Sequence, residues 1–403
     1  MTVIRHLTGA AYGTHFADQL ALVAVPLVTA LALDASPATI GLLVACQSLA
    51  HLLGSIPFGI LADQRQLRHL AITSAAVSLI GFVCAALSIG FGSVFGFGAS
   101  VTLAGFGVVL FGLTALSIVP RAASAEELGR ANASIEVPRA VCSFIVPLIV
   151  GLVISDVPGW AIFLVACLGS TLALRMSWSL PTFEVKPTEQ EAVVSKILLG
   201  GKFVLRHGLL LPISLCAIFW NFAFAALLVV LVPAIQDLFG FEPGSFGISL
   251  SAFGLGAICG TWLSGRLANR VAPAFILLFG PGTSAIAAGG LLLIGPGSIV
   301  FVQYALFFLL GFGPSMWLIA QNSVRQLVTP AAMLGRVNAV IQTAIYGIRP
   351  LGAIVGGYWA TRFGVEAGLQ LVVGAFAASF LVSAFSDLRR VSSYGALAAE
   401  QQT

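Results

Sequence analysis

The sequence predicts an all-α polytopic membrane protein with twelve transmembrane helices in two pseudo-symmetric six-helix bundles. Of its 403 residues, 59% are hydrophobic and only 8% are charged, whereas a soluble domain carries roughly 25% charged residues. Twelve apolar segments reach the roughly 20 residues that a helix needs to cross a bilayer. The third observation is a repeat, because the segment LGRANA at 128–133 returns as LGRVNA at 334–339, an offset of 334 − 128 = 206 positions.

The apolar segments fall into two groups of six on either side of a polar stretch. The first six occupy roughly residues 8–33, 38–61, 70–91, 95–119, 132–155 and 159–179, and the second six roughly residues 208–236, 244–267, 273–294, 298–322, 336–361 and 366–387. We therefore predict a first bundle over residues 1–180, a cytoplasmic linker over 181–206, a second bundle over 207–388 and a cytoplasmic tail over 389–403.

The repeat extends over most of the chain at a constant offset. Gly41 matches Gly247 and Gly151 matches Gly357, each pair 206 positions apart. A constant offset of this length indicates two homologous halves and is far too long for a solenoid. A duplicated membrane bundle is typical of secondary transporters.

Basic residues predict the orientation in the membrane. Most of the 19 Lys and Arg residues fall at the N-terminus, in the loops after even-numbered helices, in the linker and in the tail, with Arg325 and Arg336 among those assigned to loops. Arg362 falls on the opposite side, and Arg139 and Arg349 lie inside helices. Because loops rich in Lys and Arg stay in the cytoplasm, we expect both termini and the linker to be cytoplasmic.

The linker contains a segment with two interpretations. Residues 195–206 mix apolar and basic side chains, which favours an amphipathic helix on the cytoplasmic surface. The pair Gly200-Gly201 opposes a helix. The alternative is a solvated linker that only joins the two halves.

Several classes of function find no support in the residues. There is no basic stripe with interleaved aromatic residues for nucleic acid, and there is no nucleotide loop, zinc motif or serine elbow. The six cysteines stand singly in apolar runs, which is typical of small buried side chains. We therefore expect no enzyme, metal or cofactor. We expect a monomer in the lipid bilayer that draws its energy from an ion gradient, with protons as the coupling ion.

Asp18 is the principal candidate for energy coupling. A carboxylate about one-third of the way into a membrane helix is costly, so it pairs or titrates, and His15 and Gln19 lie on the same helical face. Burial would raise the pKa of Asp18 toward the physiological range, so that it takes a proton from one side and releases it to the other. The alternative is a permanent ion pair with Arg139 that only holds helices together.

Three further charged residues lie inside or at the start of predicted helices. Glu136 and Arg139 are spaced i, i+3 near the cytoplasmic start of the fifth helix, where they form either a local pair or a contact with Asp18 or an anionic substrate. Arg349 lies about halfway along the eleventh helix, before Pro350. An arginine at that depth must face protein or a water-filled cavity, which indicates substrate contact, gating or a purely structural role.

The segment GILADQRQLR at 59–68 resembles the motif that follows helix 2 in the major facilitator superfamily. Gly59, Asp63 and Arg68 match that motif, whereas Gln64 and the segment 66–67 depart from it. The resemblance implies the major facilitator fold and assigns the three matching residues to a conformational motif.

Two further stretches narrow the resemblance. The segment TPAAMLGRVNA at 329–339 resembles the macrolide-efflux and enterobactin-exporter branch, and the antiporter motif of helix 5 is degraded here to CSFIVPLIVG at 142–151. The branch implies export of small organic molecules across a bacterial inner membrane. In the superfamily, helices 1, 4, 7 and 10 line the central cavity, which implies substrate contacts for His15, Gln19, Trp220, Asn221, Gln303, Tyr304, Trp317, Gln321 and Asn322, to which we add Arg349.

The predicted cavity is largely apolar, because the fourth helix carries no charge over residues 95–119. Trp220, Trp317 and Tyr304 have a second interpretation as anchors at the membrane interface. The sequence therefore predicts a secondary active transporter that works by alternating access, with proton-coupled export of amphiphilic or hydrophobic molecules such as drugs or siderophores. The alternatives are an importer or uncoupled facilitator of a small metabolite and, more remotely, a membrane sensor or scaffold that transports nothing.

Overall fold

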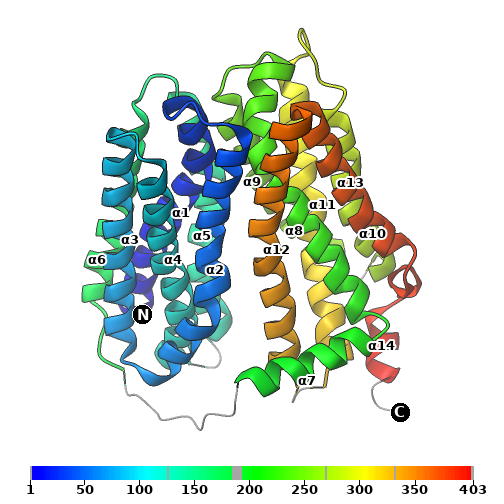
Figure 1. Cartoon of the computed structure of the whole chain (residues 1–403). Helices are drawn as coiled ribbons and strands as arrows, with labels where there is room; N and C mark the ends of the chain where they lie inside the picture. Colours follow the sequence, from blue (N-terminus) through cyan, green and yellow to red (C-terminus); the bar gives the residue numbers. More distant parts are fainter. Residues whose placement is uncertain (1, 125–126, 184–192, 268–269, 331–332, 401–403) are drawn as a thin grey trace. The chain divides into compact units, whose positions relative to one another are not determined.

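The computed structural model describes residues 2–124, 127–183, 193–267, 270–330 and 333–400. It is built of helices, as Figure 1 shows. Within the described residues, twelve helices are long and apolar enough to cross a membrane, which confirms the predicted number of spans. Contacts between residues divide the chain into two units, Met1–Glu189 with Glu242–Ser251, and Gln190–Phe241 with Ala252–Thr403.

Six helices make up most of the first unit. They are α1 (Thr2–Ala32), α2 (Pro37–Gln64), α3 (Leu67–Gly90), α4 (Val94–Ala122), α5 (Leu128–Val153) and α6 (Gly159–Trp178). Ser36 and Ser93 cap α2 and α4, because each side chain accepts a backbone N–H from the first turn. The short segment 242–251 belongs to the same unit through α5, where the Ser251 hydroxyl donates to the Phe144 carbonyl at 2.8 Å.

The second unit begins with an additional helix and ends with a folded tail. Its elements are α7 (Val193–Arg206), α8 (Leu210–Pro233), the π-helical turn η1 (Ala234–Phe239), the remainder of α9 (Ser245–Leu267), α10 (Pro273–Leu291), α11 (Val300–Val328), α12 (Leu334–Phe363), α13 (Val365–Ala384), the short η3 (Asp387–Arg390) and α14 (Tyr394–Glu400).

The helix bounds reproduce the repeat of 206 residues. Helices α3 and α10 begin at residues 67 and 273, α4 and α11 at 94 and 300, α5 and α12 at 128 and 334, and α6 and α13 at 159 and 365, so each pair begins 206 residues apart. The last residues of α4 and α11 (122 and 328) and of α6 and α13 (178 and 384) keep the same offset. Positions in the two units can therefore be compared one for one.

Glycines allow a close helix crossing in the first unit. A Cβ at Gly169 of α6 would lie 2.6 Å from the carbonyl oxygen of Gly13 on α1, and a Cβ at Gly13 would meet the Gly169 carbonyl in turn. Only glycine allows two backbones to approach this closely, as is common between membrane helices. The crossing fixes α1, the helix that carries Asp18, against α6.

Helix α7 confirms the helical interpretation of the linker, although residues 184–192 of the predicted linker lie outside the part of the chain that the structure describes. A Cβ at Gly200 would lie 2.7 Å from the backbone oxygen of Arg336, the third residue of α12. The glycine that weakens the helix by its propensity therefore lets α7 pack on α12. Val204 is buried and Leu205 is largely exposed, so the helix has one covered and one open side.

His207 connects α7 to α8. Its Nδ1 atom accepts the backbone N–H groups of Leu209 and Leu210 at 3.2 and 3.4 Å, which caps the start of α8. Burial lowers the pKa of His207, which favours the neutral ring whose Nδ1 can accept these bonds.

The tail predicted over residues 389–403 is folded as far as the structure describes it. Leu388 and Leu397 are buried in the core of the second unit, and the Ala274 N–H of α10 donates to the Val391 carbonyl at 3.0 Å. Burial raises the pKa of Tyr394 in α14, while a hydrogen bond with Ser323 of α11 opposes that rise. The tail thus covers the ends of α10 and α11.

Candidate functional site

The packing of α1 against α5 brings together the charged residues predicted in the first unit. His15 and Asp18 of α1 are both half-buried. Arg139 of α5 lies close enough to His15 to act on it electrostatically, and Asp18 acts in the same way on Cys142, one turn further along α5. The buried Nδ1 atom of His15 has no hydrogen-bond partner. These residues form one polar face between two membrane helices.

Glu136 and Arg139 form a local ion pair on α5, with Arg139 Nη2 donating to Glu136 Oε2. Both side chains are more than half exposed. This is the i, i+3 pair that the spacing favours. Exposed pairs contribute little to stability, so the pair leaves Arg139 available to groups on α1.

A second polar contact joins α8 and α12 in the second unit. The Nε–H of Arg349 donates to Asn221 Oδ1 at 2.9 Å, and Asn221 Nδ2 donates to the Ala217 carbonyl at 2.9 Å. Asn221 is buried and Arg349 is half-buried. Because Asn221 uses both ends of its amide, its orientation toward the guanidinium is fixed. The two residues were predicted separately, and the structure brings them together.

Glycines explain why Arg349 reaches Asn221. Gly352 and Gly356 lie on one face of α12, and a Cβ at Gly356 would come within 2.7 Å of the Ala226 Cβ on α8, while a Cβ at Gly352 would meet the Phe222 carbonyl. The spacing of four residues keeps both glycines on the same side of the helix. Arg349, three residues before Gly352, is thereby held at the α8 surface.

The same two helices and α13 line an apolar cavity of about 490 Å³. Its wall is formed by side chains such as Ile218, Phe219 and Phe222 of α8, Ile348 of α12 and Leu371 of α13. Phe222 directly follows Asn221 in the sequence, and Ile348 directly precedes Arg349. The contact between Arg349 and Asn221 thus lies on two helices that also line an apolar cavity.

A third polar cluster lies near the end of α11. Gln321 Nε2 donates to Asn322 Oδ1 at 2.7 Å, and Arg325 Nη2 donates to the same oxygen at 2.6 Å. Arg325 is only 9% exposed, and its Nε–H is buried without a hydrogen-bond acceptor. A buried guanidinium held only by a neutral amide is costly, which makes this residue a candidate for contact with an anion.

Arg325 corrects the sequence analysis, which assigned it to a loop. Helix α11 continues to Val328 because Val324 and Val328 bury one apolar face in the core. Pro330 then ends the helix, as the residue before a proline disfavours helical geometry. The apolar spacing beyond residue 322 was the signal that could have placed Arg325 inside the helix.

The remaining predicted cavity residues do not form one group. Trp220 Nε1 donates to Ser284 Oγ of α10 at 3.0 Å, and its ring stacks on Phe224, so the indole serves packing between helices. Trp317 is buried with its indole N–H lacking an acceptor.

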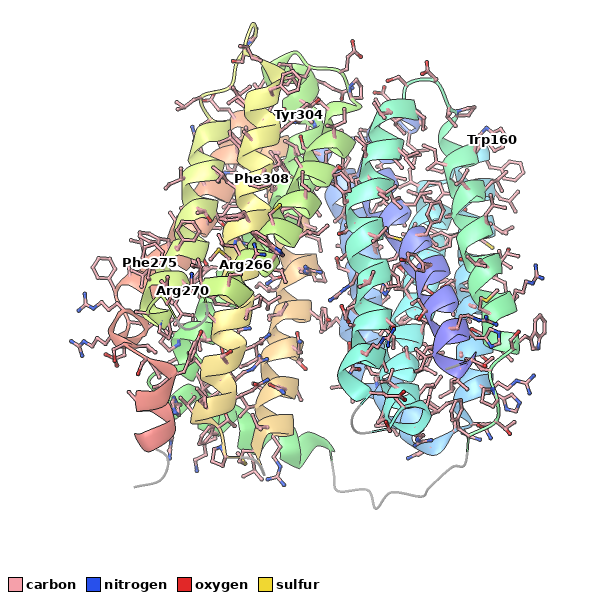
Figure 2. All side chains as sticks on the ribbon, turned by 180° about the vertical axis from the view of Figure 1, so that it is seen from behind. Trp160, Arg266, Arg270, Phe275, Tyr304 and Phe308 are labelled. Carbon is pink, nitrogen blue, oxygen red and sulfur yellow. The ribbon has the colours of Figure 1, made fainter. Side chains whose placement is uncertain are left out.

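Gln303 and Tyr304 lie at the opposite end of α11 from Gln321. Gln303 is fully buried and Tyr304 is half-exposed beside Phe301. Figure 2 shows Tyr304 near one end of its helix. Trp317 lies 317 − 304 = 13 positions after Tyr304 on the same helix. At a rise of about 1.5 Å per residue, the two residues are about 20 Å apart along the helix axis. One small ligand would not bridge that distance.

The conformational motif after α2 is described in part. The side chain of Asp63 lies outside the part of the chain that the structure describes, and Gly59 has open space where a Cβ would be. Arg68 Nη2 donates to the Trp178 carbonyl at 3.0 Å, at the last residue of α6. Gln66 Oε1 accepts the Phe183 N–H at 2.8 Å. The α2–α3 connection is therefore bonded to the end of α6.

Among the described residues, no three His, Cys, Asp or Glu side chains gather as a metal ion would require. The arrangement can bind a small molecule through amide and guanidinium donors on apolar walls, and it can hold a proton at His15 or Asp18. It presents no nucleophile with an adjacent base of the kind used in covalent catalysis.

Residues 7–353 match the sequence model of the Major Facilitator Superfamily. The chain belongs to the Major Facilitator Superfamily. It is a multi-pass inner-membrane transporter of that superfamily and not an enzyme. Superfamily members bind small-molecule substrates, which is consistent with the polar groups found on α1, α5, α8 and α12.

Curated relatives and solved structures agree with this placement. The chain is 28% identical to the enterobactin exporter EntS of Escherichia coli O127:H6 (strain E2348/69 / EPEC) over 304 residues, which cover 75% of this chain and 72% of that one. It resembles a POT family transporter in complex with 5-aminolevulinic acid, with a TM-score of 0.78, 14% identity and coverage of 95% and 96%. It also resembles the nucleoside transporter NupG, with a TM-score of 0.77, 12% identity and coverage of 98% and 99%. At such identities, the solved structures establish the superfamily fold alone.

Proposed function

We propose that the protein is a secondary active transporter that exports small amphiphilic or hydrophobic organic molecules in exchange for protons. The observation that carries export is its similarity to the enterobactin exporter over 75% of the chain. Transport would proceed by alternating access, in which the substrate site is open to one side of the membrane at a time. The distribution of Lys and Arg among the loops supports a cytoplasmic location for both termini and for α7.

The polar face between α1 and α5 supports proton coupling. Asp18 and His15 are half-buried titratable groups one turn apart on α1. Arg139 of α5 acts electrostatically on His15, and Asp18 acts on Cys142 of α5. A carboxylate in this setting changes its proton affinity when a nearby cation moves or when water reaches it. Such a change, repeated in each transport cycle, would couple proton entry to substrate exit.

The second unit supports substrate binding. Arg349 is held by Asn221 through its Nε–H, which orients the plane of its guanidinium. Apolar side chains of the same helices line a cavity. A guanidinium beside hydrocarbon suits a substrate with an acceptor or anionic group on an apolar body, and this chemistry fits drug-like or siderophore-like molecules better than sugars.

The decisive experiment separates coupling from binding. Asp18→Asn keeps the size of the side chain and removes its titration. In proteoliposomes loaded with substrate, starting with enterobactin, we expect the variant to lose nearly all efflux driven by an inward proton gradient. We expect substrate exchange at equal pH on both sides to continue, because exchange needs no net proton transfer.

Asp34→Asn is the matched control. Asp34 is exposed and has a φ of 46°, a left-handed conformation that asparagine also adopts, so the control should retain gradient-driven efflux. If Asp18→Asn keeps its gradient-driven efflux, Asp18 is a structural residue and the coupling role is wrong. If the wild type accumulates substrate only inward, or responds to no proton gradient, the protein is an importer or a facilitator.

A further inference from the structure

The end of α9 and the start of α10 carry an exposed patch that the transport proposal does not use. We define it by four residues, Trp262, Arg266, Arg270 and Phe275. Arg266 and Arg270 follow Trp262 at successive intervals of four residues, and Phe275 lies in the first turn of α10. Figure 2 shows Arg266, Arg270 and Phe275 together on one side of the second unit.

The patch has a defined internal geometry. The guanidinium carbon of Arg266 lies 3.6 Å from the centre of the Trp262 ring, which is a close cation–π contact. Stacking on the indole leaves the planar N–H edge of Arg266 open for a bidentate acceptor. The backbone N–H of Arg270 donates to the Leu267 carbonyl at 2.8 Å, so Arg270 stays at the end of the helix.

Both arginines are exposed, and within the described residues neither forms an ion pair with a carboxylate. Asp387 of η3, which precedes the tail, pairs with Arg390 at 3.1 Å. The patch therefore presents two positive charges that no carboxylate among the described residues pairs with, and charge complementarity calls for an anion.

Apolar side chains indicate which kind of anion. Trp262 is 59% exposed and Phe275 is 57% exposed, directly beside the two arginines. Both lie at the end of membrane-spanning helices, where headgroups meet hydrocarbon. In an anionic phospholipid, a phosphate group adjoins acyl chains. The guanidinium groups can bind the phosphate, and the adjoining aromatic side chains can contact the acyl chains. A soluble phosphate would leave the aromatic rings uncovered.

The repeat supplies an internal contrast. Subtracting 206 from the four positions gives Ile56, Ile60, Gln64 and His69 in the first unit. None of these four matched positions carries an arginine, a tryptophan or a phenylalanine, and the arginines of that connection, Arg65 and Arg68, lie at other positions. The patch is a property of the second unit and not of the duplicated scaffold.

We propose that Trp262, Arg266, Arg270 and Phe275 form a binding site for the headgroup of an anionic phospholipid. The phosphate accepts hydrogen bonds from the guanidinium N–H groups of Arg266 and Arg270. The parts of the acyl chains nearest the headgroup lie against Trp262 and Phe275. The site is independent of the substrate and of the direction of transport.

The test is native mass spectrometry of the purified full-length protein, titrated with phosphatidylglycerol and, separately, with phosphatidylcholine. The wild type should retain phosphatidylglycerol preferentially. Since each Lys or Arg near an anionic surface contributes about 1 kcal/mol, Arg266→Gln should weaken phosphatidylglycerol binding by about fivefold. Arg266→Lys keeps the charge but loses the stacked plane, so it should recover only part of the affinity.

Arg65→Gln is the matched control, because Arg65 is an exposed arginine at the equivalent connection of the first unit. It should leave phosphatidylglycerol binding unchanged. The proposal is overturned if Arg266→Gln and Arg65→Gln reduce binding equally, since any loss would then be a general effect of charge. It is also overturned if millimolar inorganic phosphate displaces phosphatidylglycerol, because the site would then select a soluble anion.

Discussion

The two units solve the same helix crossing differently. In the first unit, Gly13 and Gly169 bring α1 and α6 into backbone contact. The equivalent positions of the second unit, 206 residues later, are Phe219 and Ala375, and both line the cavity of about 490 Å³ between α8, α12 and α13. Two glycines thus let the backbones touch at one crossing, whereas a phenylalanine and an alanine border a cavity at the other. The duplicated scaffold is kept, and side-chain volume alone decides where space remains.

The polar contacts differ in the same way. His15 and Asn221 occupy equivalent positions, and each faces an arginine from the fifth helix of its unit, Arg139 or Arg349. Arg349 corresponds to position 143, one helical turn beyond Arg139. Arg139 is exposed and pairs with Glu136, whereas Arg349 is half-buried and bonds an amide. The first unit therefore holds titratable groups, and the second holds a fixed donor.

A pair of double-mutant cycles tests the contrast between the polar contacts and carries the largest expected effect on stability. We expect a coupling free energy of about 1.5–3 kcal/mol between Asn221 and Arg349, because a hydrogen bond to a charged group is shielded from water there. The cycle uses Asn221→Leu, Arg349→Met and the double variant. Thermal or denaturant unfolding in detergent supplies the free energies.

The control cycle is the equivalent pair of the first unit, His15→Leu with Arg139→Met. There we expect a coupling free energy below about 0.5 kcal/mol, since Arg139 is exposed and bound to Glu136. Equal coupling energies in the two cycles would mean that the burial of the two arginines does not distinguish the units.

Substitutions at the helix crossings test the contrast in packing. Gly169→Ala places a Cβ 2.6 Å from the Gly13 carbonyl oxygen, so we expect it to destabilise the protein by about 1–3 kcal/mol. Ala375→Leu adds more atoms at the equivalent position but directs them to a cavity. We expect a change within about 1 kcal/mol, with either sign.

Both variants are measured by thermal unfolding of the purified protein in the same detergent. The volume argument predicts the order of the two effects, not only their size. A larger loss for Ala375→Leu than for Gly169→Ala would show that the cavity is not a real difference between the crossings.

The smallest expected effect concerns the start of α8, which has a histidine cap. The folded-state pKa of His207 lies below its ordinary value of about 6.5. The stabilisation by the neutral cap is therefore fully present above pH of about 6.5 and is lost as the pH falls from there through the folded-state pKa. We expect the melting temperature of the wild type to fall as the pH is lowered from about 7.5 to about 5.5, by no more than the loss of one helix cap would cause, about 1 kcal/mol.

His207→Asn should reduce this loss, because the asparagine oxygen caps a helix at every pH in the range. The carboxylate of Asp387 lies near Gly208, the residue after His207, and is unchanged in the variant. His69→Asn removes an exposed histidine elsewhere and serves as the control. The cap is refuted as the cause if both variants show the same dependence of melting temperature on pH as the wild type.

Particular residues show how far the sequence alone could go. The spans were predictable because about 20 apolar residues leave no alternative to a membrane helix. The i, i+3 pair of Glu136 and Arg139 was predictable because both partners lie on one helix. The bond between Asn221 and Arg349 was not, since it depends on how closely α12 approaches α8. Arg325 was misplaced because helix ends follow tertiary burial beyond the hydrophobic segment.

The sequence by itself determined the number of spans, the duplication at an offset of 206, the membership of a transporter superfamily and the concentration of acidic groups in the first half. These can be read from composition, from the spacing of residues within one helix and from recurring sequence motifs, none of which requires distances between helices. The tertiary structure decided which arginine meets which amide, that Gly200 serves packing against α12, and that position 219 borders a cavity while position 13 borders a backbone. These depend on distances between helices that are far apart in the chain. A few glycines, which have no side chain, allow the closest of these approaches.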